Sequence, residues 1–512
     1  MKKFICLLGC IGMFFGSALA DEKLADEKTR IFVEQRMSPR PKELTVFDGI
    51  YVLNEKSTIA ISTSVALSSS QEKVIRDTIK QYWRFTPTLS FTQNPDNAKL
   101  GEEGSETNID NSGIAISAKD FTALRQALKT LRQVAESERD GTGQAFVHIK
   151  VKDWATLKFR GIHICIFPEN TLEDIEKYVR LASYYKYNYV VLEPWGTFPF
   201  KSHPEFAFAD KKLDRDGFKK IIDYCWSVGL TPIPQFSILG HATQCRVSTS
   251  KHAVLTKYPH LEHIYEPLGW SYCMSSQRTE AILKDLLTEI HEFYGKPPFF
   301  HLGCDEAYDK ASCYKCRAKP LVPLFVNHLK KFSDFMRTKG ARSIIWHDML
   351  LDRKDPRWKK DVATGDAEMA KAVKTLTKDI VIADWQYSYR DKKQTRFETP
   401  RHFKKEGFDV LVCPWEVNTG ITVLAQTAKE ENLFGILETT WHHVWNNRHY
   451  FSFFYHAGDA AWNGGKPRVD DKYAQQGLVL IPHIRHILND MGKSPYELGG
   501  TSEIQISKSV NN

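Results

Sequence analysis

One stretch of the sequence carries the main evidence for the fold: Pro297-Pro298-Phe299-Phe300-His301-Leu302-Gly303-Cys304-Asp305-Glu306-Ala307. Its apolar part is typical of a short buried strand. Because neighbouring strand side chains point to opposite faces, Asp305 and Glu306 can reach one pocket only where the strand gives way to a loop. In a parallel barrel, that end of the strand carries the catalytic groups. Gly303 indicates a place where another group approaches the backbone closely.

Short apolar strand patterns of the same kind recur through the second half of the chain, and amphipathic helical segments lie between most of them. These predicted strands are 159–164, 189–192, 231–234, 299–302, 343–346, 380–383, 408–412 and 435–438. Their alternation with helices predicts an α/β fold, a (β/α)8 TIM barrel over residues 156–466. An open doubly wound sheet is the alternative, but no Gly-rich phosphate loop follows the first strand.

The four residues His301, Gly303, Asp305 and Glu306 form the pattern His-x-Gly-x-Asp-Glu. This pattern resembles the motif of the family-20 glycoside hydrolases, the β-N-acetylhexosaminidases, and looks closest to their compact branch. The resemblance extends in order from about residue 160 to about residue 441. It implies an exo-acting enzyme that removes terminal β-linked GlcNAc or GalNAc with retention, without a cofactor, by a substrate-assisted mechanism. Glu306 would be the general acid, and Asp305 would hold the acetamido group and stabilise the oxazolinium intermediate.

The resemblance also implies a set of substrate-binding residues at the strand ends. Arg160 would bind sugar hydroxyls, for which a planar guanidinium is suited, although a structural ion pair is the alternative interpretation. His241, in a Gly-His pair after the third strand, would orient or tune the acid. Aromatic walls suit the apolar faces of a sugar ring, and the chain has tryptophans at the ends of the fifth, sixth and eighth strands. These are Trp346, Trp385 and Trp441.

Two positions depart from the family pattern. The segment after the seventh strand, 413–418, lacks the tyrosine that holds the acetamido oxygen, and His443 replaces an acidic residue. The choice between GlcNAc and GalNAc, and the linkage, therefore stay open. A two-carboxylate retaining glycosidase that uses Glu306 and Glu416 is one alternative, but such enzymes have Asn where Asp305 stands. A non-catalytic carbohydrate-binding barrel is the other.

The chain begins with features of export. Residues 1–20 combine a basic start, a short apolar core and small residues before the cleavage position, which is typical of a secretory signal peptide. A lipoprotein box ending at Cys10 is the alternative. We therefore expect a periplasmic or extracellular protein with no stable membrane span.

Residues 21–155 are predicted to form a small α+β domain. Strand alternation occurs at 58–62, 113–117 and 145–149, and helix spacing from Phe121 to Leu131, whereas the polar segment 93–113 is expected to be an exposed connection. Residues 467–512 are expected to add a helix and a polar tail.

The remaining composition excludes some functions. The net charge of +8 is spread along the chain, so nucleic-acid binding is not indicated.

The pair Cys313-x-x-Cys316 could form a disulfide, half of a zinc site with Cys273, or two ordinary thiols. A single such pair is a weak signal, and we expect no metal.

Overall fold

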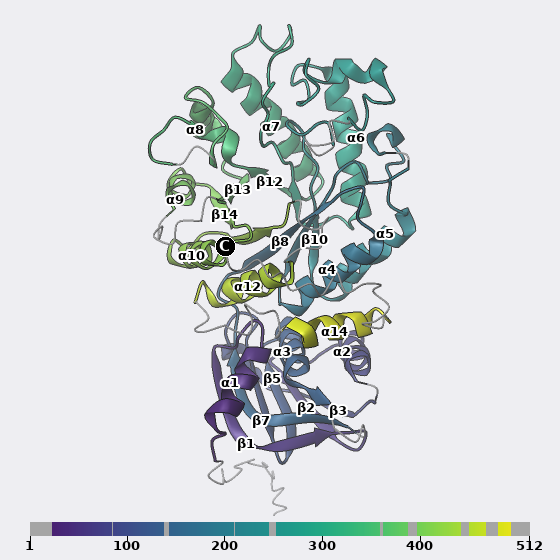
Figure 1. Cartoon of the computed structure of the whole chain (residues 1–512), viewed down its shortest axis with the longest axis vertical. Helices are drawn as coiled ribbons and strands as arrows, with labels where there is room; N and C mark the ends of the chain where they lie inside the picture. The colour runs from purple at the N-terminus through teal and green to yellow at the C-terminus, as the bar shows by residue number, and fades with distance from the viewer. Residues whose placement is uncertain are drawn as a thin grey trace, which may run out of the picture.

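The computed structural model describes residues 23–83, 85–137, 143–208, 210–244, 252–358, 362–387, 397–441, 450–466 and 480–492. The chain forms two units, with the N-terminal one at the foot of Figure 1 and the larger one above it. The expected signal peptide lies outside the described residues, and so does His443. Within the described ranges, no helix has the length and apolar character needed to cross a membrane.

The N-terminal unit is an α+β domain built on one mixed sheet, as predicted. Its strands, in the order β1-β7-β4-β5-β2-β3 with β6 paired to β7, pack against helices α1, α2 and α3. The strands are β1 (Glu43–Leu53), β2 (Thr58–Thr63), β3 (Thr88–Gln93), β4 (Ser105–Asp110), β5 (Gly113–Ala118), β6 (Glu136–Ser137) and β7 (Gln144–Asp153). The helices are α1 (Glu27–Arg36), α2 (Ser69–Tyr82) and α3 (Phe121–Val134).

The prediction of an exposed connection over residues 93–113 is wrong. This segment contains a 3-10 helix, Pro95–Lys99, and strand β4, which lies inside the sheet between β7 and β5. Ser105, Thr107 and Ile109 of β4 are buried on one face. Because only one of these three is apolar, the backbone ladders to two neighbours, and not hydrophobic patterning, give the strand its place.

The second unit is a (β/α)8 barrel, as predicted, made of one parallel sheet in the order β10-β9-β8-β15-β14-β13-β12-β11. The sheet closes where Gln235 pairs with His301, and where the Phe236 N–H donates to the His301 carbonyl at 3.0 Å. The strands are β8 (Phe159–Ile166), β9 (Tyr189–Pro194), β10 (Thr231–Pro234), β11 (Phe299–His301), β12 (Arg342–Trp346), β13 (Val381–Trp385), β14 (Asp409–Cys413) and β15 (Gly435–Thr439). Each contains one of the predicted strand segments or most of it.

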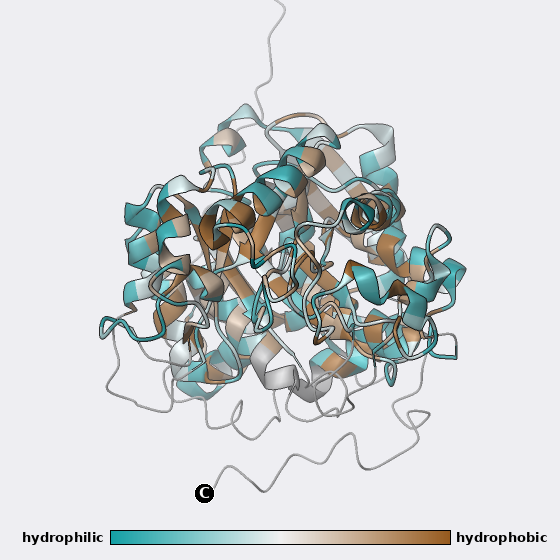
Figure 2. Ribbon diagram, turned by 90° about the horizontal axis from the view of Figure 1, so that it is seen from above, coloured by the Kyte–Doolittle hydropathy of each residue, from teal (hydrophilic) through white to brown (hydrophobic). Residues whose placement is uncertain are grey.

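Helices surround the barrel, and their hydrophilic outer faces enclose the hydrophobic strands at the centre of Figure 2. The first, α4, begins where the Thr171 hydroxyl accepts the Asp174 N–H in a capping box. The helices are α4 (Leu172–Tyr184), α5 (Arg215–Ser227), α6 (Gln277–Phe293), α7 (Leu321–Thr338), α8 (Ala372–Thr375), α9 (Glu398–Lys405), α10 (Asn418–Glu430), α12 (Tyr450–Asn463) and α14 (Leu480–Asp490). Helices α12 and α14 lie between the barrel and the N-terminal sheet (Figure 1).

Arg160 joins the two units, which corrects the prediction that it binds the sugar. Its side chain is 1% exposed, and its guanidinium lies 2.6 Å from the Glu103 carboxylate of the N-terminal domain. It also donates to the carbonyls of Leu157 and Lys186 and lies 4.9 Å from the centre of the Trp462 ring. Because Phe159 points into the barrel, strand alternation turns its neighbour Arg160 outward. Its position near the amino end of β8 is also opposite to the end where barrel sites form.

Candidate active site

The backbone after β11 turns sharply and carries the two adjacent carboxylates to the carboxyl end of the barrel. Gly303, Cys304 and Glu306 have positive φ angles of 64°, 76° and 46°. The backbone of the two non-glycine residues is strained in this conformation, and such strain concentrates at functional sites. A Cβ on Gly303 would lie 2.7 Å from the Ser237 hydroxyl oxygen, which confirms the predicted close approach.

The loop after β10 places an imidazole against both carboxylates. His241 Nε2 is 3.3 Å from Asp305 Oδ2 and 3.3 Å from Glu306 Oε2. The loop can come this close because Gly240 has no side chain: a Cβ there would lie 1.9 Å from the Asp305 carbonyl oxygen. The rings of Trp195 and Trp270 flank the imidazole, with centroids 5.2 and 4.8 Å away. The sequence-predicted trio of Asp305, Glu306 and His241 is therefore brought together.

Burial and charge set the protonation of this trio. Burial raises the pKa of Asp305; the positive charge of His241 opposes that rise, while the negative charges of Glu306 and Glu193 add to it. Burial alone would lower the pKa of His241, but the charge and hydrogen bond of Asp305, followed by those of Glu306, raise it well above its ordinary value. An imidazolium between two carboxylates is the arrangement that these shifts favour.

Asp348 is a member of the site that sequence reasoning missed. It lies two residues after the end of β12, in the 3-10 helix Asp348–Leu350, and its Oδ2 accepts the Glu306 N–H at 3.0 Å. Burial, followed by the negative charge of Asp305, raises the pKa of Asp348 to about 7. The signal available in the sequence was its place two residues after Trp346 at the end of a predicted strand. Asp348 therefore fixes the backbone of Glu306.

The three predicted tryptophans gather at the barrel mouth. The rings of Trp346 and Trp441 are 5.3 Å apart, and Trp385 stacks on Tyr387 at 5.0 Å. Tyr387, which the sequence analysis did not single out, accepts the Trp441 indole N–H at 2.6 Å. Trp346 is 1% exposed and Trp385 is 6% exposed, so each offers little free ring surface in this structure.

A second polar cluster lies at the carboxyl ends of β8 and β9. His163 Nε2 is 3.0 Å from Glu193 Oε2, and the Cys165 thiol donates to the same oxygen at 3.4 Å. Burial raises the pKa of Glu193, but the hydrogen bond and charge of His163 outweigh it and leave that pKa lowered. These three groups could surround a cation, yet they already bond to one another. Glu193 and His241 also line one small cavity, which places this cluster next to the acidic pair.

The sequence that forms this barrel matches a known family. The model of the family described as "Glycosyl hydrolase family 20, catalytic domain" matches residues 202–458, just over half of the chain. The chain belongs to glycosyl hydrolase family 20. Residues 202–458 therefore correspond to the catalytic domain of this family.

Individual relatives are more distant. The chain is 25% identical over 286 residues to the lacto-N-biosidase of Bifidobacterium bifidum, a match that covers 52% of this chain and 24% of the relative. It is 22% identical over 175 residues to the hexosaminidase D of Bos taurus, which covers 32% of this chain and 48% of the relative. The chain thus matches less than half of the length of either relative.

Two solved structures share the fold. The exo-β-N-acetylglucosaminidase of Vibrio harveyi superposes with a TM-score of 0.66 at 16% identity, over 90% of this chain and 79% of that one. The β-N-acetylhexosaminidase of Bacteroides fragilis superposes with a TM-score of 0.65 at 18% identity, over 88% of this chain and 96% of that one. At these identities the superpositions show that the barrel and its preceding domain are arranged alike.

Proposed function

We propose that this family-20 hydrolase is an exo-acting β-N-acetylhexosaminidase that removes terminal β-linked GlcNAc or GalNAc by a retaining, substrate-assisted mechanism. The observation that carries the proposal is the pair Asp305-Glu306, held by one imidazolium at the carboxyl end of the barrel. The names of the similar solved structures, an exo-β-N-acetylglucosaminidase and a β-N-acetylhexosaminidase, support the same substrate class. We also propose export of the protein, on the basis of the signal-like residues 1–20.

In the first step, protonated Glu306 donates its proton to the glycosidic oxygen while the acetamido oxygen of the substrate attacks the anomeric carbon. The bond from that carbon to the leaving group breaks, and an oxazolinium ion forms. Asp305 accepts the acetamido N–H and offsets the positive charge, for which it must be ionised. In the second step, ionised Glu306 takes a proton from water while the water oxygen attacks the anomeric carbon. The bond from that carbon to the acetamido oxygen breaks, which opens the oxazolinium ring and gives net retention.

Tyr387 is our candidate for the acetamido-oxygen donor that is absent after the seventh strand. Its oxygen accepts the Trp441 N–H, and it also bonds to the Thr439 side chain, which a substrate oxygen would have to replace as the acceptor of the Tyr387 proton. Burial raises the pKa of this hydroxyl well above 10.0, so it stays a donor at neutral pH. Its ring packs against Trp385, Trp415 and Trp441, which fixes the position of the hydroxyl.

The test compares two substrates that differ only at the 2-position. A 4-nitrophenyl β-N-acetylglucosaminide should be turned over, whereas the plain β-glucoside lacks both the nucleophile and the N–H and should react very poorly. A thiazoline analogue of the intermediate should inhibit competitively, because it resembles a state that the site stabilises. Equal turnover of both substrates would refute substrate assistance.

A covalent trap decides between the proposal and the two-carboxylate alternative. The enzyme is incubated with a 2-fluoro glycoside, and its peptides are then analysed by mass spectrometry. We expect no sugar on the protein. A sugar bound to Glu416 would identify that residue as the nucleophile and leave Glu306 as the acid.

A further inference from the structure

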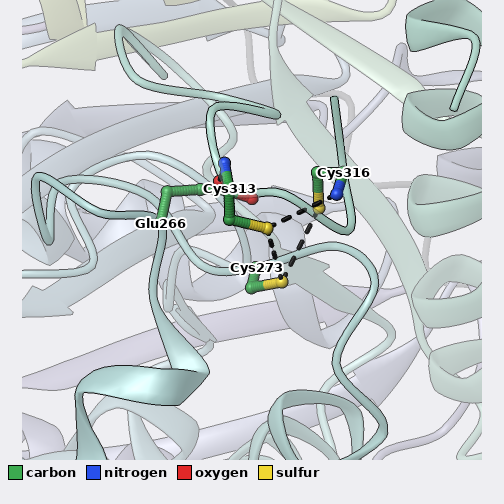
Figure 3. Close-up of side chains that lie close together, drawn as sticks. All are labelled: Glu266, Cys273, Cys313 and Cys316. Atoms are coloured by element: carbon green, nitrogen blue, oxygen red, sulfur yellow. Dashed lines mark hydrogen bonds between the residues drawn. The ribbon is translucent and has the colours of Figure 1, made fainter. Parts of the chain in front are cut away.

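Three cysteines and one glutamate converge away from the acidic pair, on two loops that are far apart in sequence. Cys273 Sγ lies 3.6 Å from Cys313 Sγ and 3.6 Å from Cys316 Sγ, and the Glu266 carboxylate is close enough for all four ligand atoms to lie within 4.8 Å of one another. Figure 3 shows the three sulfurs facing one point. We propose that Glu266, Cys273, Cys313 and Cys316 bind a structural zinc ion.

The sulfur spacing fits a metal better than a disulfide. Two thiolates on a tetrahedral zinc ion, each about 2.3 Å from it, stand about 3.8 Å apart. A disulfide would require about 2.05 Å between two sulfurs. A disulfide between two of these cysteines would also leave the thiol of the third cysteine beside it without a bonding partner of the same kind. Cys273 stands at nearly this spacing from both other sulfurs, and all three sulfurs lie within 4.8 Å of one another, which is the pattern of a site in which three thiolates bind the metal beside a fourth ligand.

Glu266 supplies an independent reason for a cation. Its side chain is buried, with the residue 1% exposed, and Oε2 accepts the Cys313 N–H at 2.6 Å. Its other oxygen, Oε1, has no hydrogen-bond partner in the described part of the chain. A buried carboxylate oxygen without a partner is costly, and a divalent ion at this point would remove that cost. Zinc accepts a carboxylate alongside thiolates.

Hydrogen-bonding groups surround the four ligands. The Cys316 N–H donates to Cys313 Sγ at 3.4 Å, within the Cys-x-x-Cys turn. The Ser275 hydroxyl lies 3.2 Å from Cys316 Sγ, and Lys319 donates to that hydroxyl at 3.0 Å. Such outer partners orient metal ligands and offset the charge of the thiolates. Because Cys273 and Cys316 are buried and four protein groups are available, the site has no open position for substrate.

The proposed ion would join the two loops that flank the acidic pair. Glu266 and Cys273 bracket a turn in which the Glu266 N–H donates to the Ser271 carbonyl at 2.8 Å, and in which Trp270 donates through its indole N–H to the Glu306 carbonyl at 2.6 Å. Cys313 and Cys316 follow Glu306 on the other loop. The ion would therefore fix the backbone of the acid from a distance. From the sequence, Cys273 is a possible zinc partner of this pair, but we expected no metal, because a single Cys-x-x-Cys pair is a weak signal. Glu266, which the sequence does not mark, joins the cysteines only in the folded chain.

The inference does not depend on the proposed function, because metal content is measured without substrate. The full chain is expressed with added zinc, purified without chelator and analysed by inductively coupled plasma mass spectrometry. We expect about one zinc per chain. Cobalt substituted for zinc should give the near-ultraviolet thiolate-to-metal charge-transfer absorption that reports sulfur ligands. Intact-protein mass spectrometry should show reduced cysteines at this site.

Single variants locate the ion. Cys273→Ala and Cys313→Ala should lower the bound zinc at least about ten-fold, and Glu266→Gln should weaken zinc retention against a chelator. Cys225→Ala is the control, since Cys225 is a buried thiol in α5 outside the cluster, and this variant should keep its zinc. If the cysteine variants fail to fold, the wild-type stoichiometry and cobalt spectrum still decide. Zinc-free wild-type protein, zinc retained by both cysteine variants, or a disulfide among the three cysteines would overturn the proposal.

Discussion

Replacing His241 with glutamine should move the pH dependence of hydrolysis toward alkaline pH. The imidazolium lies 3.3 Å from both Asp305 and Glu306, and it favours the ionised form of each. Glutamine keeps an N–H donor but removes the positive charge. The pKa of Asp305, which burial already raises, should rise further, and a higher pH would then be needed to ionise it. Because His241 also favours ionised Glu306, the limb set by the acid should shift in the same direction.

The expected magnitude follows from the distance. At 3.3 Å and an effective dielectric constant of about 20, one ion pair is worth about 5 kcal/mol. Water that enters the vacated space and local rearrangement would recover much of this energy. With about 1.4 kcal/mol for each pKa unit, we expect both limbs to move up by at least about 1 to 2 pH units. The loss of activity should therefore be larger at pH 5 than at pH 8.

The measurement is the profile of kcat/KM against pH, taken with a stopped assay on the nitrophenyl substrate. His203→Gln is the control, because His203 also lies beside carboxylates, at 3.1 Å from Asp285, but outside the acidic pair and its loop. Its profile should match that of the wild type. A His241→Gln enzyme whose activity falls equally at every pH would refute the electrostatic role and leave only a hydrogen-bonding one.

Three further changes separate the roles of other residues, and a fourth tests the proposed acetamido donor. Glu306→Gln should lower the rate by at least ~10²-fold on a natural glycoside and less on a nitrophenyl glycoside, which needs little protonation; equal losses would contradict the general-acid role. Arg160→Met should destabilise the fold by about 3–5 kcal/mol in a denaturant titration, because it leaves the buried Glu103 carboxylate without its ion-pair partner. The KM of the folded variant should equal that of the wild type. A raised KM at unchanged stability would restore the sugar-binding interpretation. The pKa of Asp348 is raised from 3.8 to about 7, so between these pH values the native state holds a proton that the unfolded chain releases, and the stability of the fold falls as pH rises. Asp348→Asn should flatten this fall when the melting temperature is measured against pH. An unchanged slope would contradict the raised pKa. Tyr387→Phe should reduce turnover of the N-acetyl substrate while leaving the melting temperature within a few degrees, and full activity would exclude Tyr387 as the acetamido donor.

The sequence by itself predicted the barrel and its acidic pair. Strand and helix periods differ, so alternating segments reveal the order of elements without any knowledge of their contacts. The pair Asp305-Glu306 follows one strand directly, and the ends of parallel strands meet at one edge of the barrel. For the same reason His241 and the three tryptophans could be assigned to that edge from their positions after other strands.

Tertiary structure decided what depends on side-chain direction and on contacts between distant segments. Arg160 lies on the correct strand, but the strand register turns it toward Glu103 in the other domain. Strand β4 has too few apolar residues to be predicted from its sequence. It is a strand because its backbone pairs with β5 on one side and β7 on the other. Asp348 and Tyr387 belong to the site through one hydrogen bond each, to the Glu306 backbone and to Trp441. Periodicity records which face of an element is buried, whereas these pairings form only when the chain folds, which is why only the folded structure shows them.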